Sequence, residues 1–508
     1  MPTFKVNVKW GKEKFTDVEC NTDEPPLLFK SQLFALSGVQ PDRQKVMMKG
    51  AVLKDEEWGN MKLKDGATLL MMGTADALQE PVEKTVFMED MNEEQLATAM
   101  ELPAGLNNLG NTCYMNATVQ CLKAVPELRE AINKVVGHPN VGAGVFNPSY
   151  AVTTALRDLY ASMDKSNTVP PLILLSILQM VFPQFAEKES EHGNWAQQDA
   201  NECWTLIVRC LQQKLTALED TAPVDGSTPA PTRGFIDQFM GVEMTSTMKC
   251  VEAPEEPPTI MKENLLQLSC FIEKDVKYLQ TGLKSRLEEH ITKNSPTLGR
   301  DAQYEKTSKI SRLPAYLTIQ FVRFFYKEKE AVNAKILKDV KFTEILDLFD
   351  LCTEELQQKL VPMRTKFKEE EDKNVERANL SKAKKGVKNA PAVPEKKTRK
   401  EPFSFPDDTG SNNSGYYKLR AVLTHRGRSS SSGHYVSWVR RKDTDEWLMF
   451  DDDKVSVVES EDILRLSGGG DWHCAYFLVY GPRVLEIEEE EVEEGAGEGQ
   501  AKPMETSS

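Results

Sequence analysis

The stretch Gly105–Gln120 constrains the fold most, because its glycine- and asparagine-rich loop leads directly into an apolar helical pattern. Gly110 and Asn111 adopt positive φ angles at little cost, so they indicate a turn. Within Cys113–Lys123, the large apolar residues recur on one face of a helix. The sequence therefore predicts a loop that places a cysteine in the first turn of a helix.

Cys113 has two interpretations. The unsatisfied N–H groups at the start of a helix and the positive end of its dipole favour a thiolate, which is the reactive form of the side chain. Most free cysteines are instead buried structural residues. The position of Cys113 alone does not choose between a nucleophile and a core residue.

The size and the cysteine content narrow the class of protein. A chain of 508 residues is too long for one ordinary domain, so two or three are expected. The nine cysteines are odd in number and scattered singly, which favours reduced thiols and a location in the cytoplasm or nucleus. No apolar run approaches about 18 residues, so we expect no transmembrane segment.

Charge is distributed unevenly along the chain. The formal net charge is −15, and the tail Val484–Ser508, with nine Glu and one Lys, contributes −8 of it. Such a block cannot bury a core, so we expect a disordered, solvated tail. No basic stripe with interleaved aromatic residues is present, which argues against nucleic acid as a partner.

Residues 1–74 have the pattern of a small β-grasp domain. Its elements follow in the order β-β-α-β-β, which resembles ubiquitin. The Gly-Gly ending of ubiquitin is missing, so the unit is expected to be a fused ubiquitin-like module with a recognition role; the alternative is a generic α+β domain. The expected strands and helix are Phe4–Trp10, Phe15–Asn21, Leu27–Leu36 (helix, ended by Gly38), Lys45–Lys49 and Thr68–Met72.

The remainder predicts an α+β domain at residues 103–483, after a polar linker at 75–102. Helices come first, at Ser149–Met163, Leu172–Val181 and from Gln197 to Leu218. Residues 364–415 contain few large apolar residues and indicate an inserted surface segment, helical at its start and otherwise flexible. The expected strands are Phe239–Lys249, Leu265–Ile272, Leu313–Phe325, Tyr417–Thr424, His434–Val439, Glu446–Phe450 and Ala475–Tyr480.

A cysteine nucleophile needs a base, and the base needs a group that orients it. His434 is the best candidate of six histidines, because the Gly/Ser loop 427–433 delivers it to the start of an aromatic strand. Asp451 lies in the turn after the next strand. A lone histidine is more often structural, and a charged turn is usually only solvated. These signals alone do not establish a triad.

Four segments resemble the conserved boxes of the ubiquitin-specific proteases. Gly105–Ala117 is similar to the family's cysteine box, and the segments 433–438 and 447–455 are similar to its histidine box. Gln197–Glu202 is similar to the short box between them. The match runs from about Leu102 to Pro482 in the right order. It implies a papain-like fold with fingers, palm and thumb.

The resemblance also implies a function: thiol-dependent hydrolysis of ubiquitin conjugates without a cofactor. It assigns Cys113 as nucleophile, His434 as base and Asp451 as the group that orients the imidazole. Asn108 matches the side-chain donor of the oxyanion hole. Asp199 and Tyr435 match positions that hold the C-terminal tail of ubiquitin, although Asp199 could be an ordinary helix cap.

The implied partners are ubiquitin, ubiquitinated proteins and the regulatory particle of the 26S proteasome, which would bind the N-terminal module. The loops 326–335 and 427–433 flank the implied tail groove and could cover it, which would give low basal activity until a partner moves them. The alternative function is a ubiquitin-binding regulator whose catalysis is minor.

One departure from the family concerns metal. Many relatives carry two Cys-x-x-Cys pairs in the fingers, a pattern that binds structural zinc. This sequence has only Cys250 there, with no second cysteine nearby. We therefore expect no zinc.

Overall fold

The computed structural model divides into two compact units, residues 1–91 and 92–508. It describes residues 3–488 except residue 60 and the segments 75–100, 138–145, 190–192, 194, 219–232, 328–331, 385–397, 430–431, 442–443 and 471. Residues 75–100 of the predicted linker 75–102 and most of the predicted acidic tail lie outside the described residues.

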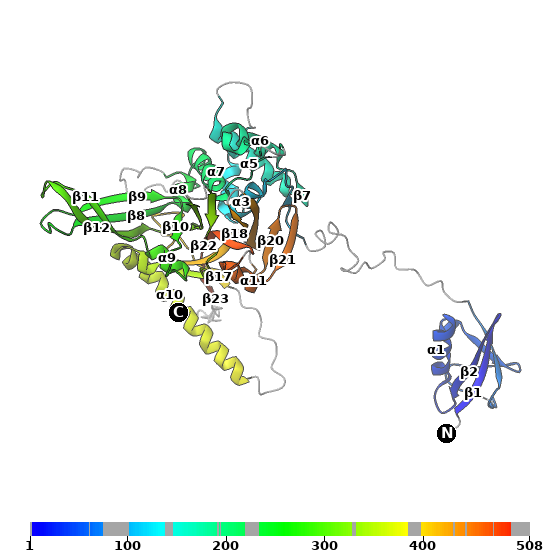
Figure 1. Cartoon of the computed structure of the whole chain (residues 1–508). Coiled ribbons are helices and arrows are strands. Elements are labelled where there is room, and N and C mark those ends of the chain that lie inside the picture. The colour runs from blue at the N-terminus through cyan, green and yellow to red at the C-terminus, as the bar shows by residue number, and fades with distance from the viewer. Residues whose placement is uncertain are drawn as a thin grey trace, which may run out of the picture. The chain divides into compact units, whose positions relative to one another are not determined.

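The N-terminal unit is a ubiquitin-like β-grasp, as predicted (Figure 1). Its sheet has the order β2-β1-β5-β3-β4, in which β1 and β5 are parallel. Helix α1 packs Phe29 and Leu33 into the core and ends at Gly38, whose φ of 70° makes the left-handed cap that the sequence predicts. The elements are β1 (Thr3–Trp10), β2 (Glu13–Asn21), α1 (Pro26–Ser37), β3 (Lys45–Met48), β4 (Ala51–Val52) and β5 (Thr68–Met72).

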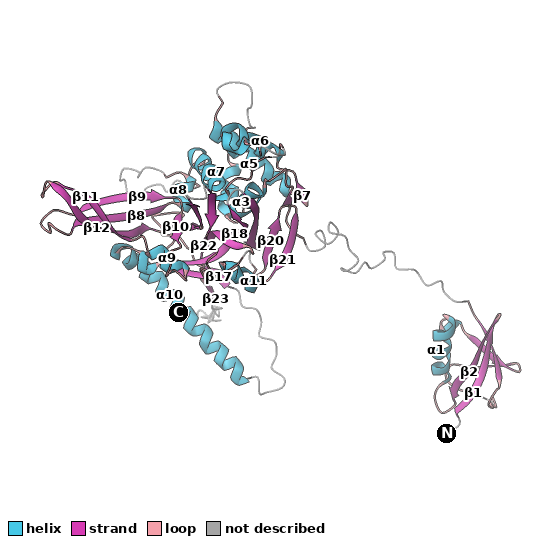
Figure 2. Cartoon of the chain, viewed as in Figure 1, coloured by secondary structure: helices cyan, strands magenta, loops and turns pink. Residues whose placement is uncertain are grey.

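The second unit begins with the helices of the thumb, which lie on one side of the central sheet (Figure 2). Helix α3 starts at Cys113, as predicted, and each of its ten residues is buried, so it is the central helix of this half. The helices are α3 (Cys113–Leu122), α4 (Pro126–Asn133), α5 (Pro148–Met163), α6 (Leu172–Val181), α7 (Ala200–Lys214) and α8 (Phe235–Met240).

The palm is a large sheet with the order β10-β13-β22-β18-β19-β20-β21. Strand β22 is buried along its whole length, because one hydrophobic core lies between the sheet and the thumb and another on the opposite face. The strands are β10 (Leu268–Phe271), β13 (Leu317–Val322), β18 (Tyr416–Ser429), β19 (Ser432–Arg440), β20 (Trp447–Asp451), β21 (Lys454–Val458) and β22 (Cys474–Pro482), with β14 (Phe324–Lys327), β15 (Val332–Lys335) and β16 (Ile345–Asp347) beside them.

The fingers project from the palm as a four-stranded sheet of order β11-β12-β8-β9 (Figure 1). At their tip, Cys250 packs in a small cluster with Tyr304. The carboxylate of Glu256 accepts hydrogen bonds from Tyr304 at 2.6 Å and from Ser295 at 2.7 Å. The strands are β8 (Val242–Cys250), β9 (Thr259–Leu265), β11 (Glu288–Ser295) and β12 (Arg300–Arg312).

The inserted segment is far more ordered than the sequence indicates. Its first part belongs to the long helix α10 (Glu354–Lys384), and β17 (Thr398–Lys400) pairs with β23 (Glu486–Glu488) from the predicted disordered tail. Residues 401–415 then return to the catalytic unit. The predicted helical start is confirmed, whereas the prediction of flexibility was wrong for residues 398–415, because polar contacts that composition does not reveal hold this part in place.

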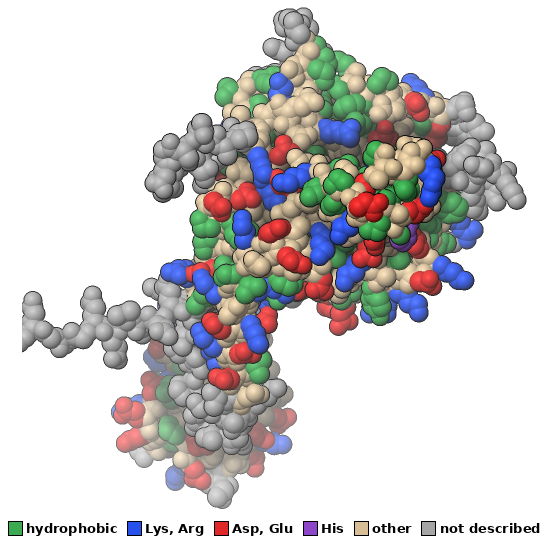
Figure 3. Space-filling view, turned by 90° about the vertical axis from the view of Figure 1, so that its left-hand side faces the viewer, with side chains coloured by type: hydrophobic (Ala, Val, Ile, Leu, Met, Phe, Trp, Pro, Cys, Tyr) green, Lys and Arg blue, Asp and Glu red, His purple; other side chains and the backbone are tan. Residues whose placement is uncertain are grey.

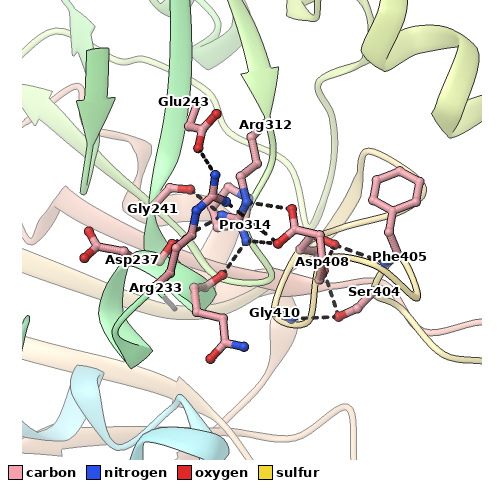
Figure 4. A network of polar contacts seen from close by, with 12 residues as sticks. Arg233, Asp237, Gly241, Glu243, Arg312, Pro314, Ser404, Phe405, Asp408 and Gly410 are labelled. Atoms are coloured by element: carbon pink, nitrogen blue, oxygen red, sulfur yellow. Dashed lines mark hydrogen bonds and ion pairs between the residues drawn. The ribbon is translucent and has the colours of Figure 1, made fainter. Parts of the chain in front are cut away.

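Arg312 is the centre of those contacts (Figure 4). Its guanidinium is 6% exposed and binds both carboxylate oxygens of Asp408, at 2.7 and 2.8 Å. It also donates to the backbone carbonyls of Gln238 and Gly241 at 2.7 and 2.8 Å. A single buried cation therefore joins the inserted segment to the base of the fingers.

Several predicted boundaries were wrong. The expected strand Phe239–Lys249 begins inside helix α8, and the expected strand Leu265–Ile272 spans the end of β9 and β10. The Gly/Ser loop 427–433 is largely strand, because β18 continues to Ser429 and β19 starts at Ser432. All nine cysteines are free and buried. Within the described part of the chain, no helix is long and apolar enough to cross a membrane.

We expect Asp408→Asn to destabilise the catalytic unit, because it leaves the Arg312 charge buried without its counter-ion. Removing one partner of a buried pair costs about 3 kcal/mol. Urea unfolding followed by tryptophan fluorescence measures this change, with the exposed neighbour Asp407→Asn as the matched control. An unchanged midpoint in Asp408→Asn would mean that the pair does not hold the segment.

Candidate active site

The loop before α3 presents Cys113 at the start of the helix. Asn111 and Gly110 have positive φ angles of 53° and 98°, which confirms the predicted turn. The side-chain oxygen of Asn108 accepts from the N–H groups of Gly110 and Thr112, at 3.0 and 3.2 Å, and so fixes the shape of the loop. Cys113 is 3% exposed. Cys113 is therefore both buried, like a core residue, and placed at the start of a helix, like a nucleophile.

His434 lies between Cys113 and Asp451. Its Nε2 is 2.5 Å from Oδ1 of Asp451, and the Cys113 side chain lies next to the same imidazole. The hydrogen bond to Asp451, followed by the interaction with Cys113, raises the pKa of His434 to about 10. The same contact lowers the pKa of Asp451. The geometry therefore favours an imidazolium–carboxylate pair next to the thiol at neutral pH.

The pKa values of two neighbouring histidines are shifted in the opposite direction. Burial and nearby cations lower the pKa of His473 to about 4 and that of His425 to about 3, so both are neutral at pH 7. The ring of His473 is 6.5 Å from that of His434 and its Nδ1 is 3.2 Å from the hydroxyl of Thr424. Of these three rings, only His434 carries a proton that it can transfer near neutral pH.

The cysteine loop is tied to the turn that carries Asp451. The N–H of Leu106 donates to the backbone carbonyl of Asp452 at 2.9 Å. A Cβ atom at Gly105 would collide with the backbone of Asp453, so only glycine fits this close approach. The contact joins the thumb, which supplies Cys113, to the palm strands that supply the other two groups.

Asp452 is a site residue that the sequence reasoning missed. Its two carboxylate oxygens accept from the side-chain amides of Asn108 and Asn116, each at 2.8 Å. One amide hydrogen of Asn108 is thereby engaged, and the other has no acceptor among the described residues. The run of three aspartates after Phe450 was the available signal, but it does not tell which carboxylate faces which loop.

Asp199 and Tyr435 lie beside this site on the thumb and palm. Asp199 caps α7 by accepting from the N–H groups of Asn201 and Glu202, so the ordinary capping role is confirmed. It also accepts from the hydroxyl of Tyr476 at 2.7 Å, and burial raises its pKa.

Tyr435 is 1% exposed, and burial raises the pKa of its hydroxyl well above the ordinary value. Its ring lies 6.2 Å from that of Tyr476. Asp199, Tyr476 and Tyr435 thus form one polar cluster behind Cys113. The assignment of Asp199 and Tyr435 to a substrate tail stays a prediction.

One group with metal-binding residue types occurs among the described residues, formed by His434, Asp451 and Asp452. Its ligand atoms are already engaged: His434 with Asp451, and Asp452 with two asparagine amides. Hydrogen bonds of this kind suit proton transfer and positioning of side chains. On the face of the catalytic unit in Figure 3, basic and acidic side chains are interspersed among hydrophobic ones.

Comparison with known proteins identifies the family. The sequence model of the family described as "Ubiquitin carboxyl-terminal hydrolase" matches residues 104–480 of this chain. The chain belongs to this family. It is therefore a thiol-dependent deubiquitinase, with an N-terminal ubiquitin-like domain and a ubiquitin-specific protease domain.

Full-length relatives support this conclusion. Ubiquitin carboxyl-terminal hydrolase 6 of Arabidopsis thaliana is 42% identical, over 96% of this chain and 100% of the relative. Ubiquitin carboxyl-terminal hydrolase 14 of Caenorhabditis elegans is 40% identical, over 99% of both chains. Ubiquitin carboxyl-terminal hydrolase 6 of Schizosaccharomyces pombe is 39% identical, over 94% of this chain and 98% of the relative.

We expect Asp452→Ala to slow hydrolysis of a fluorogenic amide of ubiquitin, because Asn108 loses the acceptor that orients its amide. If Asn108 serves the oxyanion, as the sequence predicts, the loss approaches the roughly 10²-fold typical of a missing oxyanion donor. The double variant Asn108→Ala/Asp452→Ala should then be no slower than Asn108→Ala alone. Additive losses would show that Asp452 acts independently of Asn108, and Asp453→Ala is the control.

Proposed function

We propose that the chain hydrolyses the isopeptide bond that follows the terminal glycine of ubiquitin, with Cys113 as nucleophile, His434 as acid–base and Asp451 as its orienting group. The observation that carries the proposal is the placement of the thiol beside an imidazole that is hydrogen-bonded to a carboxylate. A nucleophile, a base and an orienting group in this order are what covalent acyl transfer needs.

The proposed reaction has two stages. The Cys113 thiolate attacks the glycine carbonyl, and the resulting oxyanion accepts a hydrogen bond from the free amide N–H of Asn108. The His434 imidazolium protonates the lysine amine as it leaves, and a thioester remains. His434, now neutral, removes a proton from water as it attacks the thioester, and ubiquitin departs with a free carboxylate. No step requires a cofactor.

Recognition of the ubiquitin tail is assigned to the cluster behind Cys113. Tyr435 and Asp199 match positions that hold the ubiquitin tail in the family, and both belong to the buried polar cluster next to Cys113. Asp199 is held in the same cluster by the hydroxyl of Tyr476.

Low basal activity is part of the proposal, and the contacts of two hairpins support it. Ala334 of β15 pairs with Ser429 of β18, which joins the two segments that flank the predicted tail groove. The Lys335 side chain lies 3.1 Å from Nδ1 of His425, and the centre of the His425 ring lies 4.6 Å from that of the Tyr435 ring, at a tilt of 54°. Together these contacts anchor both hairpins next to the site, so a partner that separates them would open the groove.

The proteasome is the proposed partner. The N-terminal β-grasp unit is compact by itself and has its own hydrophobic core. Its resemblance to ubiquitin suits a receptor that recognises ubiquitin-like folds. Docking through residues 1–74 would place the deubiquitinase near ubiquitinated substrates, where it would recycle ubiquitin and limit their degradation.

The test is reaction of the purified chain with ubiquitin that carries an electrophile at its C-terminus, with and without proteasomes. We expect a covalent adduct on Cys113 that forms at least tenfold faster with proteasomes, because docking opens the groove. Intact-mass analysis detects the adduct. The chain without residues 1–74 should still form the slow adduct but should no longer respond to proteasomes.

Each part of the proposal can fail separately in this experiment. No adduct under either condition, or an adduct on a cysteine other than Cys113, would refute the assigned chemistry. Equal rates with and without proteasomes would refute the covered groove. A truncated chain that still accelerates with proteasomes would refute docking through the N-terminal unit.

A further inference from the structure

The outer side of helix α1 in the ubiquitin-like unit exposes four large apolar side chains to solvent, with the uncharged Ser31, Gln32 and Ala35 between them. Leu27, Leu28, Phe34 and Leu36 are 48, 52, 38 and 49% exposed. The one charged residue of the helix, Lys30, is 6% exposed and binds Asp55 at 2.5 Å. The exposed side of α1 therefore carries no charge.

The fold does not require these side chains. The helix buries a different side, where Phe29 and Leu33 enter the core of the unit. A helix on the surface of a small domain normally has polar residues on its outer side, and a helix that is apolar all round is normally covered. Single exposed leucines are common, but several on one helix face mark an interaction site.

The rim of this face is acidic. Asp23 and Glu24 precede the helix, and the segment Asp55–Glu57 lies against its first turn, because the N–H of Leu27 donates to the Asp55 carbonyl. The Trp58 indole fixes the same segment by donating to the Glu24 carbonyl at 2.7 Å. Asp55 is paired with Lys30, and the exposed carboxylates of Asp23, Glu24, Glu56 and Glu57 border one end of this uncharged surface.

The exposed face of the sheet in the same unit is bordered by positive instead of negative charge. Its exposed apolar residues, Leu70 and Met72 on β5, have the lysines of β1 and β3 nearby on the same sheet, at Lys5, Lys9 and Lys45. Since α1 packs on the opposite face of the sheet (Figure 1), the unit has two separate apolar surfaces with borders of opposite charge.

We propose that the outer face of α1 is a second docking surface, whose occupant is an amphipathic helix of another protein with lysine or arginine at one end of its apolar face. Leucine-type residues of that helix cover Leu28 and Leu36, and its basic end meets the carboxylates of Asp23, Glu24, Glu56 and Glu57. Helix-in-groove recognition uses apolar anchors at i, i+3, i+4 and i+7, and charges at the rim set partner choice and orientation.

The probe is a fluorescein-labelled 18-residue helical peptide with leucines on one face and lysines at one end of that face. Its twin carries glutamates in place of the lysines. Anisotropy titrations use the full chain, its helix variant Leu28→Gln/Leu36→Gln and the matched sheet variant Leu70→Gln/Met72→Gln. We expect the affinity of the basic peptide for the sheet variant to lie within twofold of its affinity for the native chain. Its affinity for the helix variant should be at least tenfold lower.

A charge-reversal variant tests whether the acidic rim selects the basic peptide. In Glu56→Lys/Glu57→Lys the basic peptide should lose at least tenfold in affinity and the glutamate twin should gain. Thermal unfolding of all variants should match the native chain, because the altered side chains lie outside the core. Equal binding of the two peptides, loss of binding in the sheet variant instead of the helix variant, or no binding to the native chain would overturn the proposal.

Discussion

The close approach of the Gly105 backbone to the turn at Asp452 and Asp453 is the constraint on which the site depends. Without a Cβ, this residue lets the cysteine loop hydrogen-bond to the turn that ends β20. Asp452 strengthens the same junction through the amides of Asn108 and Asn116. Cys113 belongs to the thumb, whereas His434 and Asp451 belong to the palm, so this junction sets the distance between nucleophile and base.

Buried charge serves a similar purpose elsewhere in the catalytic unit. Arg312 joins the inserted segment to the base of the fingers, and Arg323, which is fully buried, donates to the carbonyls of Ile336, Lys338, Ser467 and Ala475. Each guanidinium gathers segments that are distant in sequence. An arginine offers five donors in a rigid plane, so it can satisfy several loop carbonyls that no apolar residue could pair.

These contacts explain what the sequence could and could not predict. The β-grasp unit, the helix from Cys113 and the strands around His434 follow from local periodicity and turn residues. The ordered structure of residues 398–415 could not be predicted in this way, because it depends on the ion pair between Arg312 and Asp408, which lie 96 positions apart in the sequence. Asp452 was missed for the same reason: three adjacent aspartates look alike until the fold decides which of them meets Asn108.

The charged state of His434 is the central claim, since both the proposed thiolate and the protonation of the leaving amine need it. NMR titration of the chain with ¹⁵N-labelled imidazoles, assigned with His434→Gln, measures it directly. The His434 ring should remain an imidazolium through neutral pH with a pKa near the value of about 10 that Asp451 and Cys113 impose, and Asp451→Asn should lower this pKa. A ring that titrates near the ordinary value of about 6.5, unchanged in Asp451→Asn, would contradict the account.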